Sequence, residues 1–252
     1  MSMHNTYTQI IAGTEKYFKE AEYQRAVIGV SGGLDSAVAL KLTIDAIGKE
    51  NVSAIIMPEK GITSDENSSH AKALCSYFEV ETYFVPINSF IIEFMPLPWK
   101  PSELALINTK SRLRTNILYN FANTRNALVI GTANKTDLSI GYGAKHGDLA
   151  SDIFIIGDLY KDEVQKLAEH LELPDELIKK TPTGELYKGQ SDENELGAPL
   201  KEIDAVLRQN EEGVSKEDLL SKGISPNAIH KTLRLKKENA HKTEKIPVIK
   251  AH

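Results

Sequence analysis

The chain has 252 residues and a mass of 27.9 kDa, and 41% of its residues are hydrophobic and 26% charged. This composition excludes fibrous and intrinsically disordered proteins, and the length allows a core that needs no disulfide or metal. A formal net charge of −5 argues against a nucleic-acid-binding or membrane-surface protein, and no apolar stretch is long enough to span a bilayer. The single cysteine, Cys75, indicates a reducing compartment, so we expect a cytoplasmic protein.

Short apolar runs alternate with helical patterns through the first two-thirds of the chain. Strands are predicted where continuous apolar runs end at turn residues, at 26–30, 53–57, 82–87, 127–130 and, more briefly, 153–156. Helices are predicted where apolar residues recur at helical spacing, at 36–47, 64–78, 103–122 and 162–171. This alternation is typical of an α/β fold in which helices flank a doubly wound parallel sheet.

The last third of the chain has a different pattern. Residues 184–197 are polar and acidic, which predicts a mobile loop. Helical spacing resumes in three segments, at 199–208, 215–221 and 225–240. We therefore predict a single domain over 1–252, with a core at about 10–183 and a helical C-terminal extension at 198–245.

A polar, glycine-rich segment follows the first predicted strand, at the carboxyl edge of the sheet where open α/β folds bind ligands. It consists of Gly29, Val30, Ser31, Gly32, Gly33, Leu34, Asp35 and Ser36. The glycines let the backbone turn tightly against a ligand, the amides and hydroxyls can donate to an anion, and Asp35 can hold a magnesium ion. The segment has neither a Gly-Lys-Ser/Thr nor a Gly-x-Gly-x-x-Gly pattern. It therefore predicts a phosphate-binding loop of another kind, with a purely structural glycine turn as the alternative.

The residues Ser31-Gly32-Gly33-Leu34-Asp35-Ser36 resemble the pyrophosphate loop of the N-type ATP pyrophosphatases. Enzymes of that superfamily have an adenine nucleotide alpha hydrolase-like fold and cleave ATP between its α- and β-phosphates. Further blocks, at 108–112, 127–137, 141–152, 159–161, 180–183 and 190–193, together resemble NAD synthetase. This second resemblance covers the chain from about residue 10 to residue 245.

The resemblance implies contacts to ATP and to a metal. The loop at 29–36 would cradle ATP, and Asp35 and Asp137 would hold Mg²⁺, with Asp137 standing where the family usually has glutamate. Three further contacts to ATP would come from Thr132, Lys161 and Thr183. Because aspartate is shorter by one methylene, direct contact of Asp137 with the metal is left open.

The resemblance also implies a dinucleotide substrate, deamido-NAD. Its contacts would come from Arg112, Lys145, Asp152, His241 and Lys242. Solvent-exposed cations and ordinary turn residues are the alternative interpretation of these positions.

In the NAD synthetase family, ATP activates the carboxylate of deamido-NAD as an adenylate, and ammonia then displaces AMP to give NAD. Lys161 would stabilise the leaving pyrophosphate, and Asp148 or Asp152 would bind ammonium and accept its proton. The chain leaves no room for a glutaminase domain, so we expect ammonia itself to be the nitrogen source. The family also implies a homodimer, and neither nucleic acid nor a membrane is an expected partner.

Two other functions stay open at this point. Another member of the superfamily, such as a tRNA-modifying sulfurtransferase, lysidine synthetase or the ATPase part of GMP synthetase, would share the loop. The acidic net charge and the single cysteine argue against a tRNA modifier and a sulfurtransferase. A regulatory protein that senses ATP without turnover is the second alternative, and pyrophosphate release would distinguish an enzyme from it.

Overall fold

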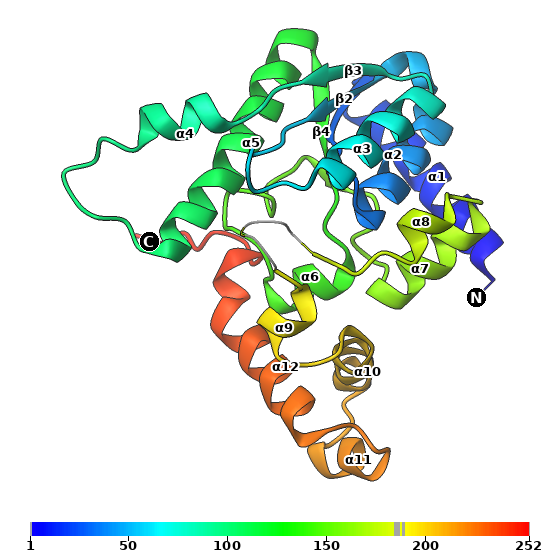
Figure 1. The fold of residues 1–252 in the computed structure, drawn as a ribbon. Helices are drawn as coiled ribbons and strands as arrows, with labels where there is room; N and C mark the ends of the chain where they lie inside the picture. The colour runs from blue at the N-terminus through cyan, green and yellow to red at the C-terminus, as the bar shows by residue number, and fades with distance from the viewer. Residues whose placement is uncertain (1, 184–186, 188–189, 252) are drawn as a thin grey trace.

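The computed structural model describes residues 2–183, 187 and 190–251, and a parallel sheet of five strands lies at its centre (Figure 1). The strands are β1 (Arg25–Gly29), β2 (Val52–Ile56), β3 (Glu81–Phe84), β4 (Ala127–Gly131) and β5 (Ile153–Phe154). Their order is β3-β2-β1-β4-β5, and each neighbouring pair is parallel. The chain winds outward from β1 to β3 and then returns to β4 on the other side of β1. This confirms the predicted doubly wound sheet, and its winding direction reverses between β1 and β4.

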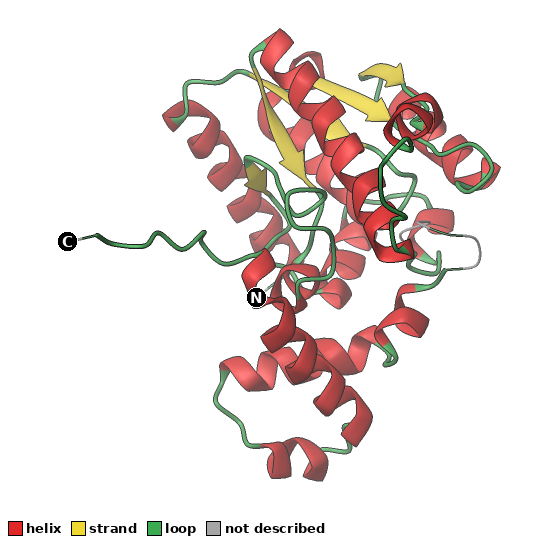
Figure 2. Ribbon diagram, turned by 90° about the vertical axis from the view of Figure 1, so that its left-hand side faces the viewer, coloured by secondary structure: helices red, strands yellow, loops and turns green. Residues whose placement is uncertain are grey.

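Helices cover both faces of the sheet because its central strands are apolar on both sides. In β1, Ala26 and Ile28 pack into one core cluster and Val27 packs into another. The first cluster is covered by α1 (Met3–Glu20), α2 (Leu34–Ile47), α3 (Asp65–Tyr77), α7 (Lys161–His170) and α8 (Asp175–Ile178). The second is covered by α4 (Asn88–Phe94) and α5 (Glu103–Arg125). A short 3-10 helix, η1 (Lys49–Asn51), connects α2 to β2. Figure 2 shows the sheet enclosed between these helices.

The C-terminal helices project away from the sheet as the predicted helical extension (Figures 1 and 2). They are α10 (Leu200–Glu211), α11 (Lys216–Ser221) and α12 (Pro226–Asn239), followed by the 3-10 helix η2 (Ala240–Lys242). Two short helices, α6 (Lys135–Ile140) and α9 (Asp192–Leu196), connect this extension to the rest of the molecule. Their residues Ile140 and Leu196 are buried in one cluster with Ile203 and Ala228 of the extension.

Parts of the predicted boundaries are wrong. The predicted strand at 82–87 ends at Phe84 because Pro86 has no N–H to continue the ladder. The strand at 153–156 stops at Phe154, where Gly157 N donates to the Phe154 carbonyl and closes a turn.

The predicted loop at 184–197 is wrong for Asp192–Leu196, which form α9. Ser191 accepts a hydrogen bond from Asn194 N at 3.3 Å and so caps this helix, and acidic residues in its first turn complement the helix dipole. Residues 184–186, 188 and 189 of that predicted loop lie outside the described residues.

Within the described ranges, none of the helices combines the length and the apolar character that a membrane crossing requires.

Candidate active site

The loop between β1 and α2 has the backbone that the sequence predicts for a phosphate-binding turn. Gly32 has φ +83°, and a Cβ at this position would lie 2.2 Å from the backbone oxygen of Asn67. Glycine is therefore required here both by the left-handed conformation and by the close approach of α3. Gly33 is the N-cap of α2 and provides no side-chain cap, so the N–H groups of the first turn of α2 are available to an anion.

The two serines of this loop hold its shape. Ser36 Oγ donates to the Gly33 carbonyl at 2.9 Å, and Ser31 Oγ accepts from Gly33 N at 3.2 Å. The two hydroxyl oxygens lie 3.1 Å apart. Ser36 is 3% exposed and borders the α7 cavity, so its hydroxyl orders the loop, and its predicted contact with an anion stays a prediction.

Asp35, in the first turn of α2, is joined to two other elements. Lys161 Nζ of α7 forms an ion pair with Asp35 Oδ2, and Asn134 Nδ2 donates to Asp35 Oδ1 at 3.2 Å. Burial alone would lower the pKa of Lys161, but Asp35 and Asp137 outweigh it and raise the pKa. Lys161 is therefore a cation at neutral pH and lies beside the phosphate loop.

Asp137 lies in the same cluster, on α6. Asn134 caps this helix and exchanges hydrogen bonds with Asp137, whose backbone N–H donates to Asn134 Oδ1 at 3.0 Å. Burial, and next the charge of Asp35, raise the pKa of Asp137 to about 8. Burial and the charge of Asp35 therefore disfavour the ionised form of Asp137 in the free protein, and a cation bound beside both groups would favour that form.

The donor set fits a magnesium ion bound together with a nucleotide. Mg²⁺ in such sites takes one or two carboxylates from the protein and further oxygens from phosphate. Asp35 and Asp137 supply two carboxylates beside the phosphate loop. In the part of the chain that the structure describes, no group of three or more His, Cys, Asp or Glu side chains is arranged to hold a metal without a ligand.

A buried network that sequence reasoning missed fixes the start of α7. Asp204 of α10 is 1% exposed, and its carboxylate accepts from Thr136 Oγ1 at 2.5 Å and from Asp162 N at 3.1 Å. Thr136 Oγ1 in turn accepts from the backbone N–H of Lys161 at 3.0 Å. Burial raises the pKa of Asp204 despite these hydrogen bonds. The C-terminal extension thus positions α6 and α7, which carry Asp137 and Lys161.

Two cavities meet at the phosphate loop. The first, which we call the α7 cavity, has a volume of about 840 Å³ and has Asp35, Asp137, Lys161, Lys180 and Thr183 in its wall. The second, which we call the α5 cavity, has a volume of about 210 Å³ and lies beyond the carboxyl ends of β1, β2 and β4. Ser31, Thr132 and Asp148 line both cavities, so these residues mark their junction.

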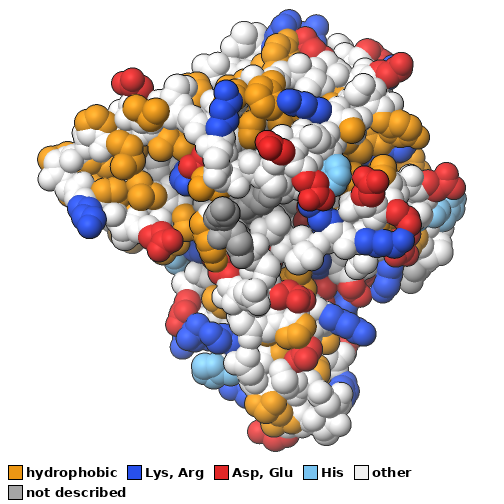
Figure 3. Space-filling view, in the orientation of Figure 1, with side chains coloured by type: hydrophobic (Ala, Val, Ile, Leu, Met, Phe, Trp, Pro, Cys, Tyr) orange, Lys and Arg blue, Asp and Glu red, His pale blue; other side chains and the backbone are white. Residues whose placement is uncertain are grey.

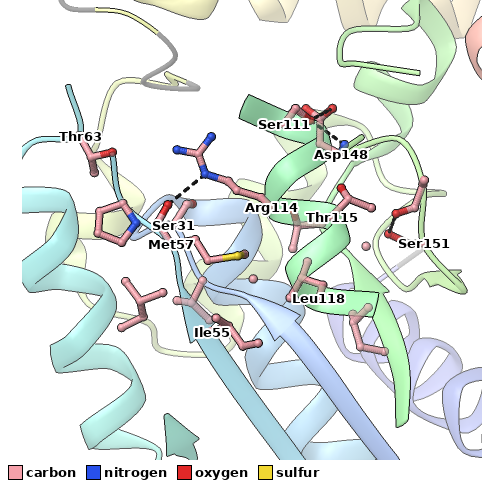
Figure 4. A pocket seen from close by; sticks show the side chains of 18 of the residues that line it. Ser31, Ile55, Met57, Thr63, Ser111, Arg114, Thr115, Leu118, Asp148 and Ser151 are labelled. Carbon is pink, nitrogen blue, oxygen red and sulfur yellow. Dashed lines mark hydrogen bonds between the residues drawn. The ribbon is translucent and has the colours of Figure 1, made fainter. Parts of the chain in front are cut away.

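The α5 cavity combines apolar walls with a few polar groups (Figure 4). Ile55, Met57 and Leu118 form the apolar part. Asp148 accepts from Ser111 Oγ at 2.8 Å and from Ala144 N at 2.7 Å, which fixes its carboxylate at the cavity wall. Arg114 of α5, which sequence reasoning did not single out, also lines this cavity.

Three of the five residues predicted to contact a dinucleotide are joined by hydrogen bonds, and a fourth, Lys242, is bonded to the loop after α6. Arg112 Nε donates to the Lys145 carbonyl at 3.0 Å, and Lys145 Nζ donates to the His241 carbonyl at 2.6 Å. Lys242 Nζ donates to the carbonyls of Gly141 and Gly143 at 2.9 and 3.1 Å. Burial lowers the pKa of Lys242. These cations come from α5, the loop after α6 and η2, so residues far apart in the sequence meet here.

Asp152, the fifth of these residues, lies apart from both cavities. Its carboxylate accepts from Val129 N at 2.7 Å and from the Tyr119 hydroxyl at 3.2 Å, beside β4. Both carboxylate oxygens are hydrogen-bonded at the sheet and Asp152 lines neither of the two cavities, so its roles in binding the dinucleotide and in accepting a proton stay predictions. Asp148 is at the junction and stays the candidate for that role.

A phosphate-binding loop at the point where a doubly wound sheet reverses direction defines a nucleotide-binding α/β protein. Comparison with known proteins narrows this class. The NAD synthase family model matches residues 6–246. The NH(3)-dependent NAD(+) synthetase of Methanosarcina acetivorans is 38% identical over 252 residues, covering 98% of this chain and 98% of that protein. The corresponding protein of Fusobacterium nucleatum is 34% identical over 250 residues, covering 99% and 96%.

Two solved structures are similar over nearly the whole chain. The NH3-dependent NAD synthetase of Campylobacter jejuni has a TM-score of 0.85 at 30% identity, with 99% of this chain and 100% of that chain covered. The NMN synthetase of Francisella tularensis has a TM-score of 0.89 at 27% identity, with both chains fully covered. The chain belongs to the NAD synthase family.

Proposed function

We propose that the two cavities share one molecule of ATP, with the triphosphate in the α7 cavity and the adenosine in the α5 cavity. The chain is a ligase that amidates deamido-NAD with ammonia at the expense of ATP, giving NAD, AMP and pyrophosphate. The observation that carries the proposal is the position of the phosphate loop, whose Ser31 lies where the two cavities meet and whose Asp35 pairs with Lys161 in the wall of the α7 cavity.

Activation of the carboxylate takes place at this junction. A carboxylate oxygen of deamido-NAD forms a bond to the α-phosphorus of ATP, and the bond from that phosphorus to the bridging oxygen of the β-phosphate breaks. The electron pair leaves with pyrophosphate, and charge that develops on it is stabilised by the first-turn amides of α2 and by Lys161. The charged form of Lys161, favoured by its acidic neighbours, suits this role.

Amide formation follows at the carbonyl carbon of the adenylate. Ammonia attacks the carbonyl carbon of the adenylate, the bond from that carbon to the phosphate oxygen breaks, and AMP leaves with the electron pair. The nitrogen must lose a proton, for which we propose the Asp148 carboxylate because it lies at the junction of the cavities. Thr132 and Thr183 line the α7 cavity and would contact the phosphates.

Magnesium would be held by Asp35 and Asp137 together with phosphate oxygens. When bound, it would neutralise charge on the phosphates. The raised pKa of Asp137 supports this assignment, since a cation next to two crowded carboxylates would relieve their repulsion. The dinucleotide would lie along the cluster formed by Arg112, Lys145, His241 and Lys242.

The cellular context is also a proposal. A cytoplasmic location is supported by the single free thiol, Cys75, which is buried on α3. A homodimer is supported by the exposed apolar side chains on and after α4, where Figure 3 shows hydrophobic groups gathered at the left of the view. These side chains are Phe90, Ile92, Phe94, Met95, Trp99 and Leu104.

The test of the proposed function is a reconstituted reaction. The protein is incubated with ATP, Mg²⁺, ammonium and deamido-NAD, and NAD is detected with a coupled dehydrogenase. A parallel reaction contains nicotinate mononucleotide in place of deamido-NAD, because the similar structure from Francisella tularensis is that of an NMN synthetase. We expect faster amidation of deamido-NAD; faster amidation of the mononucleotide would reassign the substrate, and no amidation of either at neutral and alkaline pH would contradict the proposal.

A further inference from the structure

Arg114 is a cation that points into the α5 cavity from the middle of α5 (Figure 4). Its Nε donates to the Met57 carbonyl at 3.0 Å, which fixes the base of the guanidinium against the end of β2. Figure 4 shows its two terminal nitrogens directed away from Met57, on the side of Thr63. The group is therefore held by one nitrogen and presents the other two to the cavity.

Among the described residues this guanidinium forms no direct ion pair, although the charges of Glu59 and Asp148 act on it from a distance. Nearby acids are used elsewhere: Glu59 forms an ion pair with Lys110 Nζ at 2.8 Å, and Asp148 accepts from Ser111 and from the Ala144 amide. Burial lowers the pKa of Arg114, and Glu59 and Asp148 offset this only in part. A largely buried cation that has one hydrogen bond to a carbonyl and no direct ion pair is unfavourable in the free protein, so it would attract an anion that enters the cavity.

The proposed placement of ATP identifies that anion. The adenosine would occupy the apolar part of the cavity at Ile55 and Met57, and the β- and γ-phosphates would lie in the α7 cavity beside Lys161. The α-phosphate is then the phosphate at the junction, next to Ser31, which lines the α5 cavity together with Arg114 and also lines the α7 cavity. The flat, forked guanidinium suits two oxygens of one phosphate.

We propose that Arg114 binds the α-phosphoryl group of ATP and is a catalytic residue of the adenylation step. This inference rests on the proposed function and adds a contact to it. As the carboxylate oxygen of the second substrate approaches the α-phosphorus, both reactants are anions, and Arg114 neutralises the phosphoryl oxygens that would repel it. The same contact stabilises the charge shared by those oxygens while the bond to pyrophosphate breaks.

The test measures adenosine, AMP and ATP binding by titration calorimetry, together with NAD formation. Arg114→Gln removes the charge. Arg114→Lys keeps the charge but removes the forked guanidinium group, and Arg125→Gln is the matched control. Arg125 lies in the last turn of the same helix, exposed and near Glu81. We expect Arg114→Gln to weaken AMP and ATP binding about tenfold or more, the loss of one charge-assisted contact, with adenosine binding within about twofold of wild type. We expect Arg114→Lys to lie between wild type and Arg114→Gln, and Arg125→Gln to match wild type.

Thermal unfolding of the ligand-free variants separates binding from folding. Because Arg114 forms no direct ion pair in the free protein and a single hydrogen bond to the Met57 carbonyl, Arg114→Gln should not lower the melting temperature by more than a few degrees. Unchanged AMP affinity in a folded Arg114→Gln variant would overturn the inference, and so would an equal loss of adenosine affinity, which would indicate packing. A raised KM for deamido-NAD with normal AMP binding would also overturn it. Failure of wild type to bind ATP or form NAD would instead contradict the proposed function.

Discussion

Gly32 illustrates how one residue can set the geometry of the phosphate loop. Its φ of +83° disfavours any side chain, and the backbone oxygen of Asn67 occupies the place of a Cβ. Gly61 provides a natural comparison, because it has φ +92° with nothing within 4 Å of the position a Cβ would take. The pair therefore separates the cost of backbone conformation from the cost of the clash.

We predict that Gly32→Ala lowers stability and ATP affinity more than Gly61→Ala does. Both variants lose about 1 kcal/mol of stability to the left-handed conformation, but only Gly32→Ala must also move α3 away from the loop. Chemical denaturation and ATP titration measure the two effects. Gly61→Ala should bind ATP normally, and normal ATP affinity in Gly32→Ala would show that the loop does not hold the phosphates.

The carboxylate of Asp137 gives a second prediction at the scale of single residues. Asp137→Glu preserves the charge and adds the one methylene that the family usually has at this position, so it should retain activity. Asp137→Ala removes one of the two carboxylates proposed to hold magnesium. This variant should lose most of its activity, with kcat/KM reduced about 100-fold, which corresponds to about 2.7 kcal/mol. NAD formation across a magnesium titration checks both variants. Full activity of Asp137→Ala at low magnesium would make this carboxylate incidental.

At the scale of elements, the N-terminus of α7 depends on a helix from another part of the chain. Asp204 of α10, at the edge of the α7 cavity, accepts hydrogen bonds from Thr136 of α6 and from the first turn of α7, and through them it holds Lys161 toward Asp35. It is a positioning residue. Removing its carboxylate leaves a buried hydroxyl and a buried N–H without their partner.

We predict that Asp204→Ala lowers the free energy of unfolding by about 2–4 kcal/mol and raises the KM for ATP more than it lowers kcat. Asp204→Asn keeps one hydrogen-bond acceptor and should therefore restore part of the stability and part of the affinity for ATP. Asp218→Ala, an exposed acid on α11 of the same extension, is the matched control. An Asp204→Ala variant with normal stability and normal KM would show that α10 does not position Lys161.

The elements that sequence could predict are those with long periodic patterns or strong apolar runs. The central strands were predicted from their continuous apolar runs, and α2, α3, α5 and α7 from apolar residues that recur at helical spacing over several turns. Ser64 caps α3 by accepting a hydrogen bond from Asn67 N, as the sequence indicates. The short helices α6 and α9 have five or six residues, too few to show a period. They are defined instead by caps at Asn134 and Ser191 and by packing against the C-terminal extension.

The site residues likewise divide into those that the sequence predicts and those that only the fold reveals. The loop at 29–36 and the cluster of Asp35, Asp137 and Lys161 were predicted from local motifs and their resemblance. Arg114 and Asp204 were missed because nothing in their local sequence marks them, and only the fold brings α5 and α10 to the loop. The order of strands places residues from distant segments at one edge of the sheet, and this arrangement cannot be read from spacing alone.

At the scale of the whole molecule, the exposed apolar surface on and after α4 is a candidate for contact between two copies of the chain. Ile92 and Trp99 are 67% and 63% exposed, and contiguous apolar surface of this kind is uncommon on a monomer. We predict that the wild-type protein is a dimer by light scattering and that a variant combining Ile92→Ser and Trp99→Ser is a monomer. Tyr77→Ser, which alters a residue that is 76% exposed on α3, should stay dimeric. A dimeric Ile92→Ser/Trp99→Ser variant, or a monomeric wild type, would exclude this surface as the dimer contact.

The central claim is that the chain breaks ATP between the α- and β-phosphates and uses the adenylyl group to make an amide. The most direct measurement follows ATP labelled in the α- and γ-phosphates during turnover with ammonium, magnesium and deamido-NAD. We predict AMP, pyrophosphate and NAD in equal amounts, and no AMP when deamido-NAD is left out. ADP and orthophosphate in their place, or AMP formed without NAD, would contradict it.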